Sequence, residues 1–143
     1  MLECVVNVSE GRDPEVLTAL AEAAGDDLLD VHVDPHHHRA VLTTVGEAAA
    51  RRLAEVAVAR IDLRDHDGVH PRLGAIDVVP FVALEGSSEE EACFARDDFA
   101  EWVAEALDVP AFAYGGDAPT LPEVRQRAFS GLDPVAGPSR PHP

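Results

Sequence analysis

Strand-like and helix-like segments alternate along this chain in an order that leaves few folds open to it. Runs rich in β-branched residues alternate with stretches in which apolar residues recur at helical spacing. In chain order these segments are strand-like 3–8, helical 14–24, strand-like 28–33, strand-like 39–45, helical 47–61, strand-like 76–84, helical 88–107 and strand-like 109–114. The first six follow the order β-α-β-β-α-β, which is the split βαβ pattern.

We therefore predict an α+β, ferredoxin-like domain with a mixed sheet, helices on one face and an extra C-terminal α-β unit. Asp13 followed by Pro14 is typical of a helix start, and Ser88 with Glu91 has capping-box spacing. Pro80 lies within a strand-like run and predicts an edge strand or a β-bulge, because proline has no N–H to donate.

The end of the chain differs in composition from the rest. A length of 143 residues suits one domain with a sizeable core. Residues 132–143 are rich in proline, which is excluded from helix and sheet interiors. We predict one domain over residues 1–131 and a proline-rich linker or tail over residues 132–143.

The charge balance excludes several classes of partner. The chain has 27 acidic and 11 basic residues, a formal net charge of −16. Such a field repels phosphate, so we expect no nucleic-acid partner and no anionic membrane surface. No apolar stretch approaches the roughly 20 residues that cross a bilayer, and the N-terminus does not resemble a targeting signal. We expect a cytoplasmic protein.

All 11 basic residues are arginines, which excludes chemistry that depends on a lysine, such as a Schiff base. An anionic ligand must therefore meet arginine or backbone N–H groups. The two cysteines, Cys4 and Cys93, have no metal-ligand spacing, and we expect reduced thiols without a chemical role.

The loop at residues 62–77 is the first candidate for chemistry. It combines His66 and His70 with several carboxylates and arginines and leads into a strand-like run. Pro71 restricts the backbone of His70, which helps to hold an imidazole in one direction. Histidines are also common in solvent-exposed loops, so the residues alone leave both interpretations open.

A second cluster lies in the expected hairpin at residues 28–45. Strand alternation puts Asp30, His32 and Asp34 on one face of the sheet, where two carboxylates and an imidazole could hold a metal. The consecutive histidines at 36–38 match no established ligand spacing. Solvated loop histidines, or the wall of an organic-ligand site, explain the same pattern, and we assign no metal site.

The end of the first strand-like run, Asn-Val-Ser-Glu-Gly at residues 7–11, is a third candidate. It places amide, hydroxyl and backbone N–H groups beside a helix start, where anions often bind. An ordinary turn has the same composition.

Four ordered blocks of this sequence resemble the glutamate formiminotransferase family. The most specific is Gly-Val-His-Pro-Arg-Leu-Gly-Ala-Ile-Asp-Val-Val-Pro-Phe at residues 68–81. The others are residues 7–11, Leu-Asp-Val at 29–31 with Arg39, and Leu-Asp-Val-Pro at 107–110 with the Tyr-Gly pair at 114–115. Together they cover nearly the whole chain.

The resemblance concerns one half of the family's enzymes. Those enzymes have two similar subdomains with folate in the cleft between them, and this chain resembles the N-terminal subdomain alone. Two positions depart from the family pattern: His38 stands where the family usually has asparagine, and Ala83 replaces a proline. The first change could alter ligand contacts, and the second could adjust a strand end.

The resemblance implies a reaction and a set of site residues. The family moves a formimino group between N-formiminoglutamate and N5 of tetrahydrofolate, which acts as co-substrate. For this chain the resemblance leaves open whether the donor carries a formimino or a formyl group. Its catalytic histidine matches His70, an acid/base suited to neutral pH. Arg39 and Arg72 are expected to pair with substrate carboxylates, although either could form a structural ion pair. The remaining binding candidates are Asn7, Asp30, His32 and Asp34, and His66 ranks below His70.

Because this chain resembles only one of the two subdomains that form the folate cleft, the resemblance implies a partner for the other half. We expect a homo-oligomer or a separate chain that carries the C-terminal subdomain, with folate- and glutamate-type small molecules as ligands. A non-catalytic module that binds folate or an amino acid is the alternative. A metal-dependent hydrolase built on the hairpin cluster is the third reading.

Overall fold

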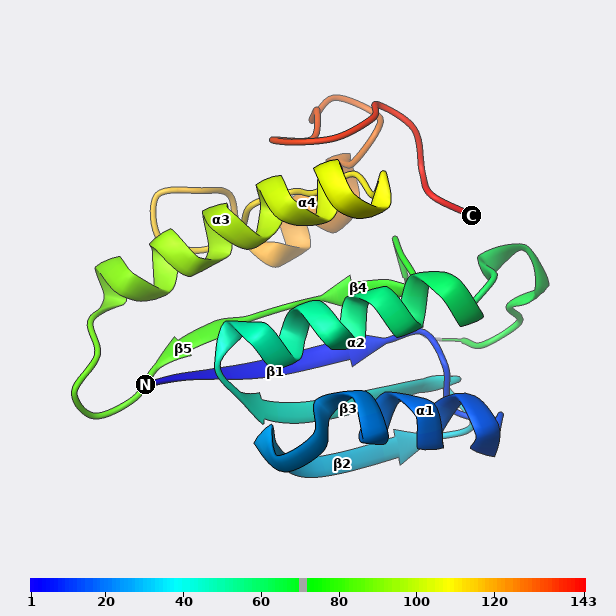
Figure 1. The fold of residues 1–143 in the computed structure, drawn as a ribbon. Coiled ribbons are helices and arrows are strands. Elements are labelled where there is room, and N and C mark those ends of the chain that lie inside the picture. The colour runs from blue at the N-terminus through cyan, green and yellow to red at the C-terminus, as the bar shows by residue number, and fades with distance from the viewer. Residues whose placement is uncertain (70–71) are drawn as a thin grey trace.

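A computed structural model describes residues 1–69 and 72–143 and shows one sheet with helices packed against it (Figure 1). The strands are β1 (Leu2–Val8), β2 (Leu28–Asp34), β3 (Arg39–Val45), β4 (Ile76–Val78) and β5 (Phe81–Ala83). Their order is β2-β3-β1-β4, and β5 pairs with the other end of β1 beside β4. Every pairing between these strands is antiparallel.

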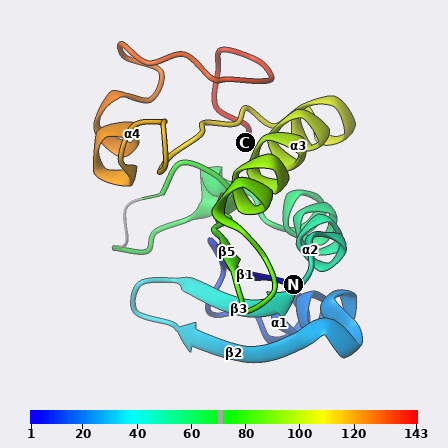
Figure 2. The same ribbon diagram turned by 90° about the vertical axis from the view of Figure 1, so that its left-hand side faces the viewer.

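Three helices cover one face of this sheet, as predicted. They are α1 (Pro14–Ala24), α2 (Glu47–Arg60) and α3 (Glu89–Leu107), and a further short helix, α4 (Leu121–Arg127), follows them. Figures 1 and 2 show α1 and α2 on the same side of the strands, and α3 packs against α2 and β5. The α+β, ferredoxin-like class is confirmed. None of the helices in the described residues is both long and apolar enough to span a bilayer.

The helix starts follow from local sequence. The Asp13 side chain accepts a hydrogen bond from the Glu15 N–H at 2.9 Å, and Pro14 occupies the first turn, where its missing N–H costs nothing. At the start of α3, Ser88 and Glu91 form the reciprocal capping box that their spacing predicts, with bonds of 3.1 and 2.7 Å.

The core lies between the sheet and these helices. Cys4, Val6 and Val8 alternate along β1 and are fully buried on the helix side, where they meet Leu20 of α1 and Leu53 of α2. Burial of each large aliphatic side chain contributes about 1.5–3 kcal/mol relative to exposure. Val5 and Asn7, which alternate with these residues along β1, are only partly buried. The opposite face of the sheet is therefore less covered than the helix side.

The apolar run at residues 76–84 is divided into two short strands. β4 and β5 both pair with β1 but are separated by Val79 and Pro80, and the register shifts between Asn7 and Val8. The Pro80 carbonyl still accepts from the Val5 N–H at 3.3 Å, while its nitrogen cannot donate to the ladder. This confirms the irregularity that Pro80 predicts.

The strand predicted at residues 109–114 is wrong. This segment has only one isolated bridge, between Ala111 and Ala136, and the chain continues into α4, which the sequence analysis did not predict. Without that strand the sheet gains no parallel pairing and is antiparallel rather than mixed. Residues 132–143 pack by hydrogen bonds from Val135 to Ala111 at 2.8 Å and from Leu63 to Pro143 at 3.0 Å. The boundary at residues 131 and 132 stays a prediction.

Candidate functional site

Five of the predicted site residues share the face of the sheet that points away from α1 and α2. Strand register aligns Asn7 with Val41 and Val41 with His32 across β1, β3 and β2. Asp30 and Asp34 alternate with His32 along β2, and Asp34 lies opposite Arg39 in the register of β2 and β3. The shared face predicted for the three β2 residues is confirmed, and Asn7 and Arg39 join it.

The hairpin side chains are not arranged around a metal position. Asp34 accepts the His37 backbone N–H at 3.0 Å, and its other oxygen lies 2.6 Å from Nδ1 of His37. Both bonds lower the pKa of Asp34, and the backbone hydrogen bond has the larger effect. Within residues 1–69 and 72–143, no three His, Cys, Asp or Glu side chains are grouped so that they could hold a metal ion. The hypothesis of a metal-dependent hydrolase therefore gains no support from these residues.

The segment at residues 7–11 forms a junction between loops. Ser9 is buried, donates its hydroxyl to the Gly74 carbonyl at 2.8 Å and its N–H to the Ala75 carbonyl at 2.8 Å. The Glu10 carboxylate accepts the N–H groups of Arg12 and Asp13 at 2.7 and 2.9 Å. A carboxylate of the chain itself thus occupies the position where an external anion was considered, ahead of α1.

The loop that carries the predicted catalytic residue is held on both sides. His70 and Pro71 lie outside the described residues. On one side, Arg72 donates to the carbonyls of His66 and Gly68 at 2.7 and 2.9 Å. On the other, Asp77 accepts the N–H groups of Leu73 and Gly74 at 2.6 and 3.1 Å. Arg72 therefore braces this loop, and a role for it in substrate binding stays a prediction.

His66 connects the same loop to the hairpin. Its Nε2 lies 2.9 Å from the His38 carbonyl oxygen, and its Nδ1 accepts the Gly68 N–H at 3.2 Å. The rings of His66 and His38 stack with centroids 4.1 Å apart and planes 15° from parallel. Nδ1 of His38 accepts the Gly11 N–H at 3.0 Å, so three loops meet at this pair.

Arg12 adds a charged contact to this junction. Its guanidinium forms an ion pair with Asp67 and donates to the Pro35 carbonyl at 2.8 Å. The ion pair lowers the pKa of Asp67. Sequence reasoning named the segments that contain Glu10 and Asp67 but missed Arg12, because its contact with Asp67 joins distant loops.

Comparison with known proteins identifies the family. Residues 1–143 match the family described as formiminotransferase domain, N-terminal subdomain. The chain belongs to this family. The resemblance noted in the sequence is thereby confirmed.

Curated relatives of this formiminotransferase N-terminal subdomain are longer proteins. The formimidoyltransferase-cyclodeaminase of Rattus norvegicus is 38% identical over 92% of this chain and 27% of its own length. The glutamate formimidoyltransferases of Streptococcus pyogenes and Thermoplasma acidophilum are 36% and 34% identical, over 92% and 90% of this chain. The chain spans 49% and 47% of those two relatives, about half of each.

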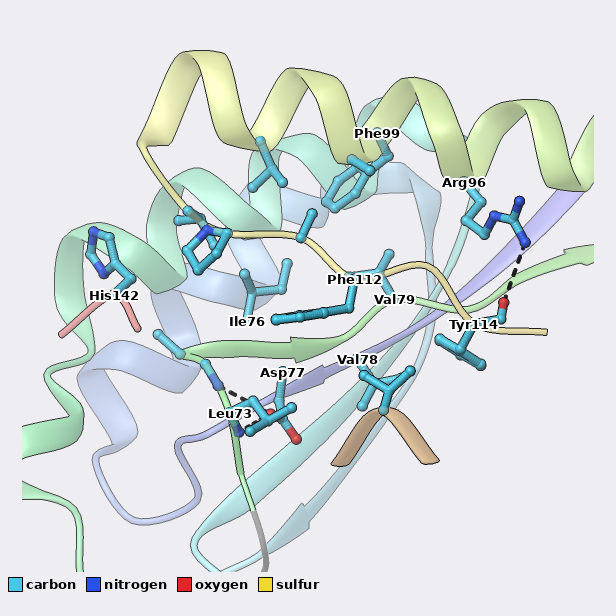
Figure 3. A pocket seen from close by; sticks show the side chains of 18 of the residues that line it. Leu73, Ile76, Asp77, Val78, Val79, Arg96, Phe99, Phe112, Tyr114 and His142 are labelled. Carbon is cyan, nitrogen blue, oxygen red and sulfur yellow. Dashed lines mark hydrogen bonds between the residues drawn. The ribbon is translucent and has the colours of Figure 1, made fainter. Parts of the chain in front are cut away.

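An apolar cavity borders the segment that follows His70, where Leu73 and Asp77 line it, and lies between β4, α3 and the segment that leads to α4 (Figure 3). It measures about 120 Å³, and Ile76, Phe99 and Phe112 point toward it. At its rim Arg96 donates to the Gly115 carbonyl at 3.0 Å. Its lining in this formiminotransferase subdomain is mainly aliphatic and aromatic.

Proposed function

We propose that this subdomain takes part in transferring a formimino group between N-formiminoglutamate and tetrahydrofolate, with tetrahydrofolate as co-substrate. One observation carries the proposal. Asn7, His32 and Arg39 share one face of the sheet. The segments on either side of His70 are bonded to loops that adjoin β3 and β1: Nε2 of His66 lies 2.9 Å from the His38 carbonyl oxygen, and the Gly74 carbonyl accepts the Ser9 hydroxyl at 2.8 Å. The printed names of the relatives, formimidoyltransferases, support the same reaction class.

The chemistry needs one proton carrier beside the reacting carbon. N5 of tetrahydrofolate attacks the amidine carbon and loses its proton, and a tetrahedral adduct forms. The bond between that carbon and the glutamate nitrogen then breaks, and this nitrogen takes up a proton. An imidazole performs both transfers near neutral pH, and we assign them to His70.

Polar groups on the same face suit the remaining parts of the ligands. Glutamate and the tail of folate both present carboxylates, which arginine binds with two parallel hydrogen bonds. We assign this role to Arg39, because it lies on the same face of the sheet as Asn7 and His32. Asn7, Asp30, His32 and Asp34 offer amide, imidazole and carboxylate groups to the ring donors and acceptors of the pterin.

The reaction also needs a second wall for the ligand. The face that bears these side chains includes Val5 and Val41, which are only partly buried in the chain alone. Another chain with a C-terminal subdomain, or a second copy of this one, would cover them. This agrees with a chain that spans about half the length of the two glutamate formimidoyltransferases.

The test is formimino transfer from N-formiminoglutamate to tetrahydrofolate, followed by folate absorbance. The chain is assayed alone over a range of concentrations and with a separately produced C-terminal subdomain of a relative. We expect turnover that rises faster than linearly with concentration, or that depends on the added subdomain, and that His70→Ala abolishes.

His36→Ala is the matched control, because His36 is an exposed histidine of the hairpin loop and its described ring contact is with His37. It should retain activity. Folate binding without turnover under every condition would favour the non-catalytic module. Turnover that survives His70→Ala would contradict the assignment of the acid/base.

A further inference from the structure

The hydrogen bonds of His66 define its protonation state. A carbonyl oxygen can only accept, so Nε2 of His66, 2.9 Å from the His38 oxygen, must carry a hydrogen. The Gly68 N–H donates to Nδ1, so that nitrogen must carry none. His66 is therefore held as the neutral Nε2–H tautomer.

His38 is held in the same form. Its Nδ1 accepts the Gly11 N–H at 3.0 Å, which requires an unprotonated nitrogen at this position. The side chain is 13% exposed and stacks on the His66 ring. Two stacked imidazolium rings at 4.1 Å would repel each other, so protonation of one ring opposes that of the other.

Charged groups on the two loops that pack against His38 influence its protonation. Glu10 lies 3.4 Å from Nδ1 of His38, and both Glu10 and Asp67 favour its protonation. Arg12 and a protonated His66 oppose it. Burial is the largest influence, and the net result is a lowered pKa for His38.

The loop at residues 66–68 packs closely against the hairpin. A Cβ added to Gly68 would lie 2.5 Å from the His37 carbonyl oxygen and 2.6 Å from Cβ of His38. His38 itself has a left-handed backbone, with φ of 54°, so its ring direction depends on an unusual conformation. The loop at residues 66–68 is thus pressed against the hairpin through the two rings.

We propose that His38 and His66 are positioning residues: as a neutral stacked pair they clasp residues 66–68, the segment that precedes His70, to the hairpin, and protonation of His38 opens the clasp. The role in catalysis rests on the proposed function. The clasp does not, because its bonds join residues of the chain itself. Its consequence is an acid limit to activity that is separate from the titration of His70.

His38→Asn can keep the hydrogen bond from the Gly11 N–H while it removes the group that titrates. Asparagine tolerates a left-handed backbone, and its amide oxygen can accept the Gly11 N–H, but it takes up no proton. His38→Ala removes both the acceptor and the stacking. His36→Asn is the control, since His36 belongs to the same loop and lies outside the clasp.

The first measurement uses nitrogen NMR of the 143-residue chain. At pH 7.5 we expect both rings as Nε2–H tautomers and slow hydrogen exchange at the Gly11 and Gly68 amides. As the pH falls into the acid range, this protection should collapse in the parent chain and in His36→Asn, while His38→Asn should keep it to lower pH. An Nδ1–H tautomer at either ring, or the same acid loss in His38→Asn, would overturn the clasp.

The second measurement is the pH profile of transfer in the assembly that shows turnover. His38→Asn should move the acid limb of kcat to lower pH, and His38→Ala should lower kcat at all pH values by roughly 10- to 100-fold, as expected for a misplaced catalytic group. An unchanged acid limb in His38→Asn would overturn the link to His70. Absence of turnover in every assembly, with the expected tautomers, would reject the proposed function and leave the clasp intact.

Discussion

The carboxylate of Asp77 in β4 accepts a hydrogen bond from the Arg125 guanidinium in α4 at 2.9 Å, although 48 positions separate the two residues. The other carboxylate oxygen accepts the N–H groups of Leu73 and Gly74. The Asp77 side chain is 4% exposed. One buried residue therefore connects the C-terminal helix to the segment that follows His70.

Asp77→Asn should destabilise the chain. It removes the negative charge that Arg125 contacts and replaces one acceptor oxygen by a donor, at a cost of about 2 kcal/mol for hydrogen bonds to a charged group. Urea denaturation followed by Trp102 fluorescence measures the change. Asp117→Asn is the control, because Asp117 meets Arg96 at 3.4 Å with a side chain that is 90% exposed, and it should leave stability unchanged. Equal effects of both substitutions would contradict this account.

Gly68→Ala should displace the loop before His70. The new Cβ would overlap backbone and side-chain atoms of the hairpin, and such overpacking costs about 1–3 kcal/mol. Gly25→Ala has no atom within 4 Å of the new Cβ, but its positive φ adds strain of about 1–2 kcal/mol. Both variants should lower the midpoint of urea denaturation. Only Gly68→Ala should shift the NMR signals of His38 and His66, and unshifted signals would refute the close contact.

Arg52→Ala should weaken the junction between α1 and α2. Arg52 donates to the carbonyls of Ala23 and Ala24 at 2.6 and 3.1 Å, which lack helical partners at the end of α1, and it pairs with Asp27. Because the side chain is 42% exposed, we expect a loss of only about 1 kcal/mol in thermal or urea unfolding. Arg60→Ala, at an exposed position of the same helix, should have no effect. A comparable loss in that variant would show that helix propensity, not the junction, is responsible.

The two cysteines should differ in reactivity. Cys4 is fully buried, and burial raises the pKa of its thiol to about 12, while Cys93 is partly exposed. A thiol reagent at pH 8 should modify one cysteine in the native chain and two in urea, with mass spectrometry assigning the fast site to Cys93. Rapid native modification of Cys4 would show that β1 opens readily.

The same shift makes stability fall at alkaline pH. The ordinary thiol pKa of 9.0 holds in the unfolded chain, whereas the folded chain keeps the Cys4 proton to about 12. Between these values the unfolded state loses its proton first, so the free energy of unfolding decreases as pH rises. Cys4→Ala should be less stable at neutral pH but lose less stability from pH 9 to 11. Cys93→Ala should follow the slope of the parent chain, and an identical slope in Cys4→Ala would contradict the prediction.

Local patterns predicted most of the elements because their causes are local. Apolar spacing and caps such as Asp13 and Ser88 act within a few residues, so α1, α2, α3 and the hairpin strands appear where the sequence indicates. The segment at residues 109–114 has the composition of a strand, yet it meets Ala136 at one bridge instead of joining the sheet. A strand needs an edge to pair with, and composition does not reveal whether one is available.

The candidate site, too, could be predicted from the sequence only in part. Alternation along β2 by itself placed Asp30, His32 and Asp34 on one face, and four ordered blocks, the most specific at residues 68–81, predicted the family. Only the tertiary structure paired His66 with His38, 28 positions away, and Ser9 with Gly74, 65 positions away. Periodicity records which way a side chain points from its own strand or helix, whereas contacts between loops depend on how those elements pack.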